Sequence, residues 1–485
     1  MVIKKYDREY VAEDCGEIQP QYTTRANKRT DSVKTEDCGE IKQSTTPNDS
    51  ILTALKQYID NNKVTGLEMK EPEDALIFAP YSSFQKSPKW TVGRYIGEMV
   101  VNLPKENIKN ARKDQTIRLS IHPRFGTKFL IHMIEEIYSF RILQSTKRQD
   151  KGNTWNNIYQ LILRQLWVAK FAKADKYGLP RKTVKRIHQG MQIHGHLNVR
   201  KSLVPFFTKK HVVSEYREKE VDDVIGRIVY KAYDILADKE TGLTGLPPQV
   251  QESINDLYTR YHKQQIKVSD HEYLNIRYKS IYLSWKPLVD FSWQIIKHKG
   301  FNPEKNIEGN GYAMFFDMAE IWEAYIGKVL ETDFFHCTQQ NSNIKLFKNE
   351  QEKEFQRIIP DYISSDWTNE KAKAIGDAKY MDLVSKTNLL GEQTYSVYYK
   401  TIMYMYRFNA KKGFIFYPKK TSDTGNAIKT FTIGGENKGA LYMIGLNIPQ
   451  NNGDMDYKDF QNKIKEKEEL FRSQVKQCLL NVHGM

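Results

Sequence analysis

Hydrophobic and polar positions repeat with different periods in different segments of the chain. Between residues 75 and 122, short apolar runs separated by turns predict strands at 75–79, 91–101 and 116–122. From there to residue 298, apolar residues mostly recur every three or four positions, which is typical of helices with one buried face. This spacing predicts helices at 129–138, 155–177, 222–237, 249–262 and 278–298. Short strands are expected at 192–194 and 197–199.

Helical and strand patterns alternate in the last third of the chain. Before them, residues 299–311 contain three glycines and three asparagines, a composition typical of a linker. Such an alternation indicates a mixed α+β arrangement. We expect helices at 314–330, 395–409 and 457–480, and strands at 345–347, 355–363, 372–381, 413–417, 430–433 and 440–444.

The first seventy residues differ from the rest because they are polar and contain few large apolar side chains. The segment Glu13-Asp14-Cys15-Gly16-Glu17-Ile18 recurs at residues 36–41, but two copies are too few for a solenoid. Neither Cys15 nor Cys38 has a histidine or second cysteine nearby at metal-ligand spacing. A flexible tail with a duplicated segment is therefore favoured over a metal site. A short amphipathic helix is expected at 50–61.

Length and composition exclude several classes of protein. A chain of 485 residues exceeds one simple core, so two or three domains are expected. No stretch reaches the roughly 18 apolar residues that a membrane span needs, and the start lacks the apolar segment of a secretory signal. Four cysteines are too few for a disulfide framework, which favours a reducing compartment. We expect a cytoplasmic protein that does not bind membranes.

Positive charge is concentrated in one segment of the chain. The formal net charge is +15, and residues 164–210 contain twelve Lys or Arg residues but one acid, Asp175, for a local charge of +11. Such a segment is either a solvated basic face or a surface that binds a polyanion such as DNA. His188, His194 and His196 also lie here; a basic surface loop is favoured over a zinc site. The candidates for contacts with DNA phosphates are Arg181, Lys182, Lys185 and Arg186.

Two acidic residues and one lysine form the strongest candidate for catalysis. Asp361 ends an apolar run, and sixteen residues later Asp377 and Lys379 occupy positions i and i+2 of an expected strand, on one side of it. If the two strands pair, the carboxylates approach each other and require a cation between them. Mg²⁺ suits such oxygen ligands, and the carbonyl of Ala378 would add another. Lys379 would then orient a water molecule or offset charge on a phosphate. The alternative is a structural Asp377–Lys379 contact beside a turn carboxylate.

Aromatic residues cluster in the helix expected at 395–409. They would either stack on bases or pack in the core, and helical spacing favours packing. They are Tyr398, Tyr399, Tyr404, Tyr406 and Phe408.

Several segments resemble one known family, in the same order along the chain. Pro360-Asp361 with Asp377-Ala378-Lys379 resembles the signature of PD-(D/E)xK nucleases. Residues 316–325 resemble the helix before this signature in the McrC subunits of McrBC-type restriction systems. Segments similar to the McrC amino-terminal region are 119–126, 194–199 and 215–227, with His194 where the family usually has arginine.

This resemblance implies roles for individual residues. Asp361 and Asp377 would be ligands of Mg²⁺, or of Mn²⁺ in its place, and Lys379 the catalytic lysine. Glu323 would match the acidic residue of the preceding helix, and is otherwise an ordinary surface glutamate. Lys400 stands where the family often has glutamine in a Gln-x-x-x-Tyr pattern, and would contact a DNA phosphate instead.

The resemblance also implies partners. McrC works with McrB, a AAA+ GTPase whose hydrolysis it stimulates, and this hydrolysis drives translocation and licenses cutting. We therefore expect a McrB-like AAA+ GTPase or ATPase hexamer, double-stranded DNA, and a second copy of this chain, because one site cuts one strand. The sequence contains no Gly-x-x-x-x-Gly-Lys-Ser/Thr phosphate loop, so we expect no nucleotide cofactor on this chain itself.

The predicted layout has four parts. Residues 1–70 would form the tail, 71–210 a β-rich adaptor domain for motor docking, 211–310 a helical connector and 311–485 the PD-(D/E)xK nuclease domain. The predicted function is a Mg²⁺-dependent DNA endonuclease subunit of a restriction or anti-phage system. A non-catalytic DNA-binding adaptor that regulates a AAA+ motor, or a stand-alone structure-specific nuclease, are the alternatives.

Overall fold

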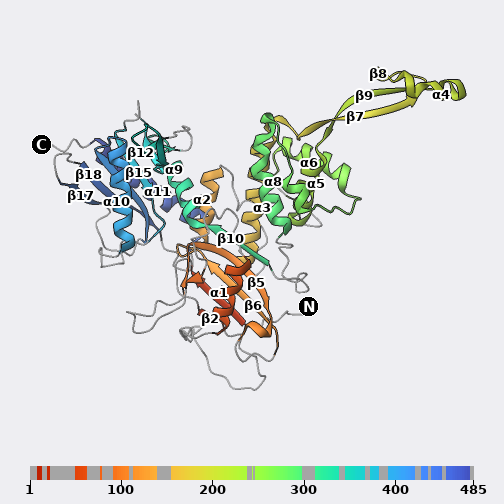
Figure 1. Ribbon diagram of the computed structural model, residues 1–485. Helices are drawn as coiled ribbons and strands as arrows, with labels where there is room; N and C mark the ends of the chain where they lie inside the picture. Colours follow the sequence, from red (N-terminus) through yellow and green to blue (C-terminus); the bar gives the residue numbers. More distant parts are fainter. Residues whose placement is uncertain are drawn as a thin grey trace, which may run out of the picture. The chain divides into compact units, whose positions relative to one another are not determined.

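The computed structural model forms two compact units (Figure 1). The first unit combines Met1–Arg141 with Gly309–Met485, and the second is Ile142–Glu308. The duplicated segments, apart from Glu13, lie outside the described residues, and so does the linker expected at 299–311. The structure describes residues 8–13, 19–21, 50–62, 77–78, 91–108, 113–138, 154–237, 243, 246–297, 312–337, 344–365, 372–381, 392–420, 428–434, 439–449 and 455–480.

The amino-terminal part of the first unit is a five-stranded sheet. Helix α1 (Ser50–Asn62) packs on it through Leu52 and Leu55, which join a core with Leu103, Leu119 and Phe315. Strand β1 pairs in parallel with β6, so the described residues 8–13 belong to a sheet and differ from the expected flexible tail. A separate hairpin pairs β3 (Ile77–Phe78) with β4 (Thr91–Val92). In spatial order the sheet strands are β10 (Tyr312–Asp317), β5 (Tyr95–Leu103), β6 (Gln115–His122), β1 (Arg8–Glu13) and β2 (Gln19–Gln21).

The predicted helix at 314–330 is wrong in its first turn. Residues 312–317 form β10, which pairs antiparallel with β5, and helix α9 (Met318–Val329) begins only afterwards. Asp317 sets this boundary as the N-cap, because its carboxylate accepts a hydrogen bond from the Ala319 backbone N–H at 2.8 Å. The same carboxylate makes two charge-assisted contacts with Arg94, both at 2.9 Å. Residues 312–317 therefore complete the first sheet, although the sequence places them at the start of the expected nuclease domain, 311–485.

The carboxyl-terminal part of the first unit is a six-stranded mixed sheet with helices on both faces. Phe416 contacts Phe471 of α11 (Tyr457–Leu480) on one face, whereas Val397 of α10 (Glu392–Arg407) packs with Ile415 on the other. β15 and β16 are parallel, as are β16 and β18, and the remaining pairs are antiparallel. The strand order is β11 (Phe334–His336), β14 (Tyr362–Ser364), β15 (Ala374–Ala378), β16 (Lys412–Lys420), β18 (Gly439–Ile448) and β17 (Ile428–Ile433).

Two more elements complete this unit. The strand expected at 355–363 is interrupted at 358–361, so that β13 (Glu354–Arg357) pairs with β12 (Lys345–Lys348) in a separate hairpin. Helix α2 (Thr127–Tyr138) packs against α9 and α11. The mixed α+β class that the sequence predicts is confirmed.

The second unit is mainly helical. Its core surrounds the buried Trp167 and Trp285, and the Trp167 indole N–H donates to Ser292 Oγ at 2.9 Å. The helix expected at 278–298 is a 3-10 segment, Ser280–Trp285, followed by α8. No helix in the described parts of the chain is both long and apolar enough to cross a membrane. Apart from α4 (Val199–Lys209), which lies on a two-stranded ribbon, the described helices are α3 (Thr154–Ala174), α5 (Asp223–Leu236), α6 (Pro248–Tyr261), α7 (Asp270–Leu274) and α8 (Lys286–Lys297).

A long two-stranded ribbon extends from the helices of this unit (Figure 1). It pairs β7 (Arg181–Gly190) with β9 (Val212–Val221), and α4 (Val199–Lys209) lies at its far end with the short β8 (His196–Leu197). The strand expected at 192–194 is wrong, and that at 197–199 is only partly right. Asn198 instead caps α4, since its side chain accepts a hydrogen bond from the Lys201 backbone N–H at 3.1 Å.

Candidate active site

The pairing of β14 with β15 brings the two predicted aspartates together. Tyr362 lies opposite Gly376 in this antiparallel pair, so Asp361 lies beside the end of β15 that carries Asp377. The backbone N–H of Ala378 donates a hydrogen bond to Asp361 Oδ2 at 2.7 Å. This bond anchors the Asp361 carboxylate at the end of β15, although Asp361 itself comes before the first residue of β14.

Asp377 is completely buried and is paired with a lysine. Lys379 Nζ lies 2.5 Å from Asp377 Oδ2, with 21% of the Lys379 side chain exposed. Neither carboxylate oxygen of Asp377 accepts a hydrogen bond within the described part of the chain. Lys379 already neutralises Oδ2 through the ion pair, but a buried oxygen without a hydrogen bond is costly, so Oδ1 is left available for another positively charged ligand.

The charges at this site strongly influence one another. Burial raises the pKa of Asp361 well above its ordinary value, and the negative charges of Asp377 and Glu323 raise it further. Burial likewise raises the pKa of Tyr404 on α10, with Asp377 and Asp361 adding to the effect. The two aspartates therefore lie near one another and near α10, in a place that favours either a proton or a cation between them.

Glu323 lies close to the pair but has a partner of its own. Its Oε1 is 2.6 Å from His336 Nε2 on β11, and its backbone carbonyl accepts a hydrogen bond from the Tyr362 hydroxyl. These contacts hold the α9 glutamate beside Asp361. Sequence reasoning missed His336, because a single histidine on a short strand gives no local signal.

The donor set fits a magnesium ion that keeps several of its water molecules. Among the described residues, no group of three or more His, Cys, Asp or Glu side chains is arranged to hold a metal. Two carboxylates and a backbone carbonyl remain, at Asp361, Asp377 and Ala378. Mg²⁺ commonly binds through one or two carboxylates and retains water in its other positions, so Asp377 Oδ1, which accepts no hydrogen bond from the described residues, fits it.

The family match covers most of the chain. A family model described as "McrBC 5-methylcytosine restriction system component" matches residues 97–418. The chain belongs to this McrBC family. The resemblance that its sequence motifs indicate is thereby confirmed.

Two solved structures are similar to the chain over much of its length. One is a half-complex from a tetradecameric assembly of Thermococcus gammatolerans McrB AAA+ hexamers with bound McrC: 14% identity, 88% of this chain and 94% of that chain covered, TM-score 0.46. The other is the Thermococcus gammatolerans McrBC complex: 13% identity, 67% and 87% covered, TM-score 0.34. No curated protein matches.

One segment that resembles McrBC proteins lies directly beside the aspartate pair. The turn after β6 contains Arg124 and Phe125, and both contact Tyr380, which follows Lys379. The Phe125 and Tyr380 ring centroids are 5.9 Å apart, and Trp322 of α9 completes the aromatic cluster. The resemblance at 119–126 follows from the sequence, whereas its contact with Tyr380, the residue after Lys379, does not.

Lys400, where the resemblance predicts a contact with a DNA phosphate, lies on α10. Lys400 is exposed, and its Nζ lies 5.7 Å from the centroid of the Tyr404 ring. The charges of both aspartates reach Tyr404, so Lys400 is near the site, but it forms no hydrogen bond or ion pair with either aspartate within the described residues.

The basic residues predicted to contact DNA lie on β7, in the ribbon of the second unit. Two of the four pair with acids of β9: Lys185 with Glu215, and Arg186 with Glu220, whose Oε1 accepts from Arg186 Nε at 2.9 Å. Lys182 Nζ is 3.9 Å from Asp222. Arg181 has no side-chain partner in the described ranges. Cross-strand acids thus offset much of the positive charge that the sequence places here.

Proposed function

We propose that this protein is the Mg²⁺-dependent DNA endonuclease subunit of a McrBC-type restriction system. The observation that carries the proposal is the buried Asp377 carboxylate beside Asp361: its Oδ2 lies 2.5 Å from Lys379 Nζ, and its Oδ1 accepts no hydrogen bond from the described residues. The proposal is also supported by membership of the McrBC family, which rests on the match over residues 97–418. The six-stranded mixed sheet that presents these residues is compatible with a PD-(D/E)xK nuclease fold.

Each side chain has a distinct role in the proposed hydrolysis. Asp361, Asp377 and the Ala378 carbonyl would hold Mg²⁺, which polarises the scissile phosphate and activates a bound water. Lys379 orients the attacking water and offsets the charge that develops on the phosphate. Asp377 keeps the lysine ammonium in place through their contact. Glu323, held by His336, adds negative charge that favours a cation at the pair.

The proposed system includes a motor protein. The sequence has no phosphate loop, so the energy for translocation would come from a McrB-like AAA+ GTPase or ATPase. The ribbon of the second unit is a suitable contact for it, since α4 and the adjoining turn expose large apolar side chains. A second copy of the chain would supply the second cut of double-stranded DNA. The exposed apolar residues include Met191, Val199, Val204 and Phe207.

Plasmid cleavage tests the nuclease directly. Purified chain, its AAA+ partner, NTP and Mg²⁺ are incubated with plasmid, comparing wild type with Asp377→Ala and Lys379→Ala. We expect each substitution to lower the rate at least about 100-fold, because each removes a group that acts on the reacting phosphate. Stimulation of the partner's NTPase should be unchanged. Lys328→Ala is the control, since Lys328 forms only an exposed ion pair with Glu331. Wild-type cleavage by Asp377→Ala would overturn the proposal.

A further inference from the structure

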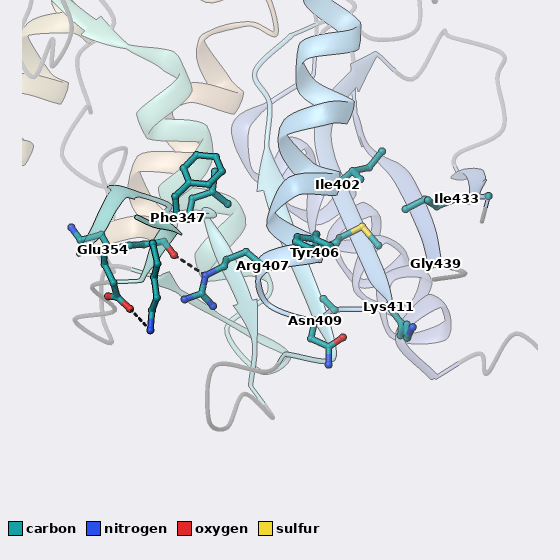
Figure 2. Close-up of a pocket in the computed structure, with 15 residues that line it drawn as sticks. Phe347, Glu354, Ile402, Tyr406, Arg407, Asn409, Lys411, Ile433 and Gly439 are labelled. Atoms are coloured by element: carbon teal, nitrogen blue, oxygen red, sulfur yellow. Dashed lines mark hydrogen bonds and ion pairs between the residues drawn. The ribbon is translucent and has the colours of Figure 1, made fainter. Parts of the chain in front are cut away.

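A second concave site lies in the same unit, at the end of α10 (Figure 2). This pocket of about 610 Å³ is formed by the last turn of α10, the β12–β13 hairpin and the segments where β16 and β18 begin. Its volume falls within the range of small-molecule sites. Its lining includes Lys345, Phe347, Tyr406, Arg407, Lys411 and Ile433.

The pocket combines apolar walls with several cations. Arg407 is held in place because its Nε donates a hydrogen bond to the Lys345 carbonyl at 2.7 Å. The ammonium groups of Lys345 and Lys411 have no carboxylate partner among the described residues. Glu354 is the acidic residue of the lining, and it lies 3.5 Å from Lys348 in an ion pair. The remaining positive charge suits an anion that also has an apolar part.

Two aromatic side chains of the pocket are exposed to solvent. Tyr406 is 79% exposed and Phe347 is 47% exposed. Phe347 is supported by Phe355 of the neighbouring strand, with ring centroids 5.4 Å apart. By contrast, Tyr404 and Phe408 of the same aromatic run are buried. Within this run, Tyr404 and Phe408 therefore pack in the core, whereas the ring of Tyr406 is open to a ligand.

We propose that this pocket binds one unpaired nucleotide of the DNA strand, an inference that rests on the proposed nuclease function. The base would stack on Tyr406 or Phe347, and the adjoining phosphates would contact Lys345, Arg407 and Lys411. Open aromatic rings beside cations are the combination by which proteins bind single-stranded nucleic acid without reading its sequence. An anion without an apolar part would contact only the cations of this lining, and a purely apolar ligand would contact only its aromatic rings.

The position of the pocket relative to the aspartate pair fits this role. β15 and β16 are parallel, with Ala374 opposite Lys412 and Asp377 opposite Ile415. The pocket lies where β16 begins, and the aspartates lie where β15 ends. Three residues of strand span roughly 10 Å, a distance that a few nucleotides of a single strand cover. The occupied nucleotide would thus be a few steps from the phosphate that is cut.

Lys400 and Tyr399 lie between these two places. They are exposed residues in the middle of α10, and Arg407 is seven residues further on, roughly 10 Å along the helix axis. Tyr399 and Tyr406 are separated by two helical turns and are both exposed. One strand could therefore follow α10 from the nuclease site to the pocket.

DNA binding by the full chain tests this inference without requiring cleavage. All variants carry Asp377→Ala to prevent hydrolysis, and fluorescence anisotropy measures binding of a labelled duplex with an eight-nucleotide single-stranded tail and of the same duplex without a tail. We expect Tyr406→Ala to weaken binding of the tailed duplex about tenfold, because stacking on one base is lost. Tyr406→Phe should retain the affinity. Lys411→Ala should weaken it as well, and more so at low salt.

Controls separate this site from general charge effects. Tyr177→Ala and Lys458→Ala replace exposed residues away from the pocket lining and should bind the tailed duplex like the parent. Deoxycytidine monophosphate, added as a competitor, distinguishes the source of the nucleotide. Competition that depends on Tyr406, without any effect of Tyr406→Ala on the tailed duplex, would assign the pocket to free nucleotides and overturn the DNA-strand assignment.

The outcome is independent of the cleavage test. Equal affinities of parent, Tyr406→Ala and Lys411→Ala for the tailed duplex would overturn the inference, even if Asp377→Ala abolishes cutting. Conversely, cleavage by Asp377→Ala would overturn the proposed function, while a tenfold loss in Tyr406→Ala would still identify a strand-binding pocket.

Discussion

The guanidinium carbon of Arg124 lies 4.4 Å from the ring centroid of Tyr380, the residue after Lys379. It also lies 4.9 Å from the Phe125 ring. Because Lys379 N–H donates to the Phe416 carbonyl at 2.8 Å, the catalytic candidate is held between a strand bond and this cation–π contact. The turn after β6 thereby reaches the end of β15, so the amino-terminal sheet helps to position the lysine.

Arg124→Met should slow DNA cleavage while leaving the protein folded. A partly desolvated cation–π contact is worth about 1–2 kcal/mol, so we expect a loss of roughly tenfold in the rate if the contact positions Lys379. Tyr380→Phe keeps the ring and should retain most of the rate, whereas Tyr380→Leu should not. Rates of plasmid cleavage and circular dichroism spectra check these expectations. A folded Arg124→Met protein that cuts as fast as wild type would disprove the positioning role.

Mg²⁺ affinity should increase with pH. The pKa of Asp361 is raised above its ordinary value, first by burial and then by Asp377 and Glu323, so a proton competes with the metal for this carboxylate. Raising the pH removes the proton, and the affinity should rise by up to about tenfold per pH unit while Asp361 is partly protonated. Isothermal titration calorimetry with Mg²⁺ between pH 5 and 8 measures this slope.

The matched control for the metal titration is Asp377→Ala. It removes one expected ligand and one charge that raises the pKa of Asp361, so both the affinity and its pH dependence should fall. A dissociation constant for Mg²⁺ that stays the same from pH 5 to 8 in the wild type would contradict the competition between proton and metal.

The catalytic candidates were predictable because their geometry is local. The i, i+2 relationship of Asp377 and Lys379 follows from strand periodicity alone, and a sixteen-residue separation allows Asp361 to return beside them. His336 and Arg124 were missed because their contacts are made across the fold, to α9 and to the end of β15. No periodicity in the sequence reports such long-range contacts.

Elements of the fold were likewise predictable where the local sequence pattern marks them, and were missed where it does not. Helices with one buried face, such as α3 and α5, lie where the apolar spacing predicts them. The strands of the ribbon were missed since most residues of β7 are exposed on both faces, which removes the alternation that marks a half-buried strand. β10 was mistaken for helix because its apolar run continues into the apolar face of α9.

Replacing Glu468 should weaken the packing of three helices. Its Oε1 lies 2.7 Å from His132 Nε2 of α2 and accepts a hydrogen bond from Tyr325 of α9. Although burial alone would raise the pKa of Glu468, the hydrogen bond and charge of His132 lower it. Removing one member of a buried pair costs about 3–5 kcal/mol, so Glu468→Ala should unfold at a clearly lower urea concentration.

The pH dependence gives this prediction its second readout. Because the folded-state pKa of Glu468 is lowered, its stabilising contribution is present above the ordinary glutamate pKa of 4.5 and is lost as the pH falls through the folded value. Glu466, two residues earlier, is exposed and serves as the control position. Equal urea midpoints for Glu468→Ala and Glu466→Ala at pH 7 would refute the role of this pair.

Asp175→Asn should stabilise the helical unit at neutral pH. Asp175 is fully buried; its Oδ2 accepts a hydrogen bond from Ser253 at 2.8 Å, and Oδ1 has no hydrogen-bond partner within the described ranges. Burial raises its pKa from 3.8 to about 6, so the fold prefers the protonated form. Stability from this residue is therefore greatest below pH 3.8 and is lost as the pH rises to about 6, by roughly 3 kcal/mol. The uncharged asparagine should remove that loss.

Urea unfolding at pH 4, 5, 6 and 7, followed by hydrogen exchange in the helices of this unit, measures the effect of Asp175→Asn. The variant should gain most over wild type at pH 7 and least at pH 4, because only the wild-type carboxyl ionises between these values. Asp256→Asn, an exposed substitution on α6, should follow the wild-type curve at every pH. If Asp175→Asn keeps the wild-type slope between pH 4 and 6, the buried carboxyl is not the group that sets it.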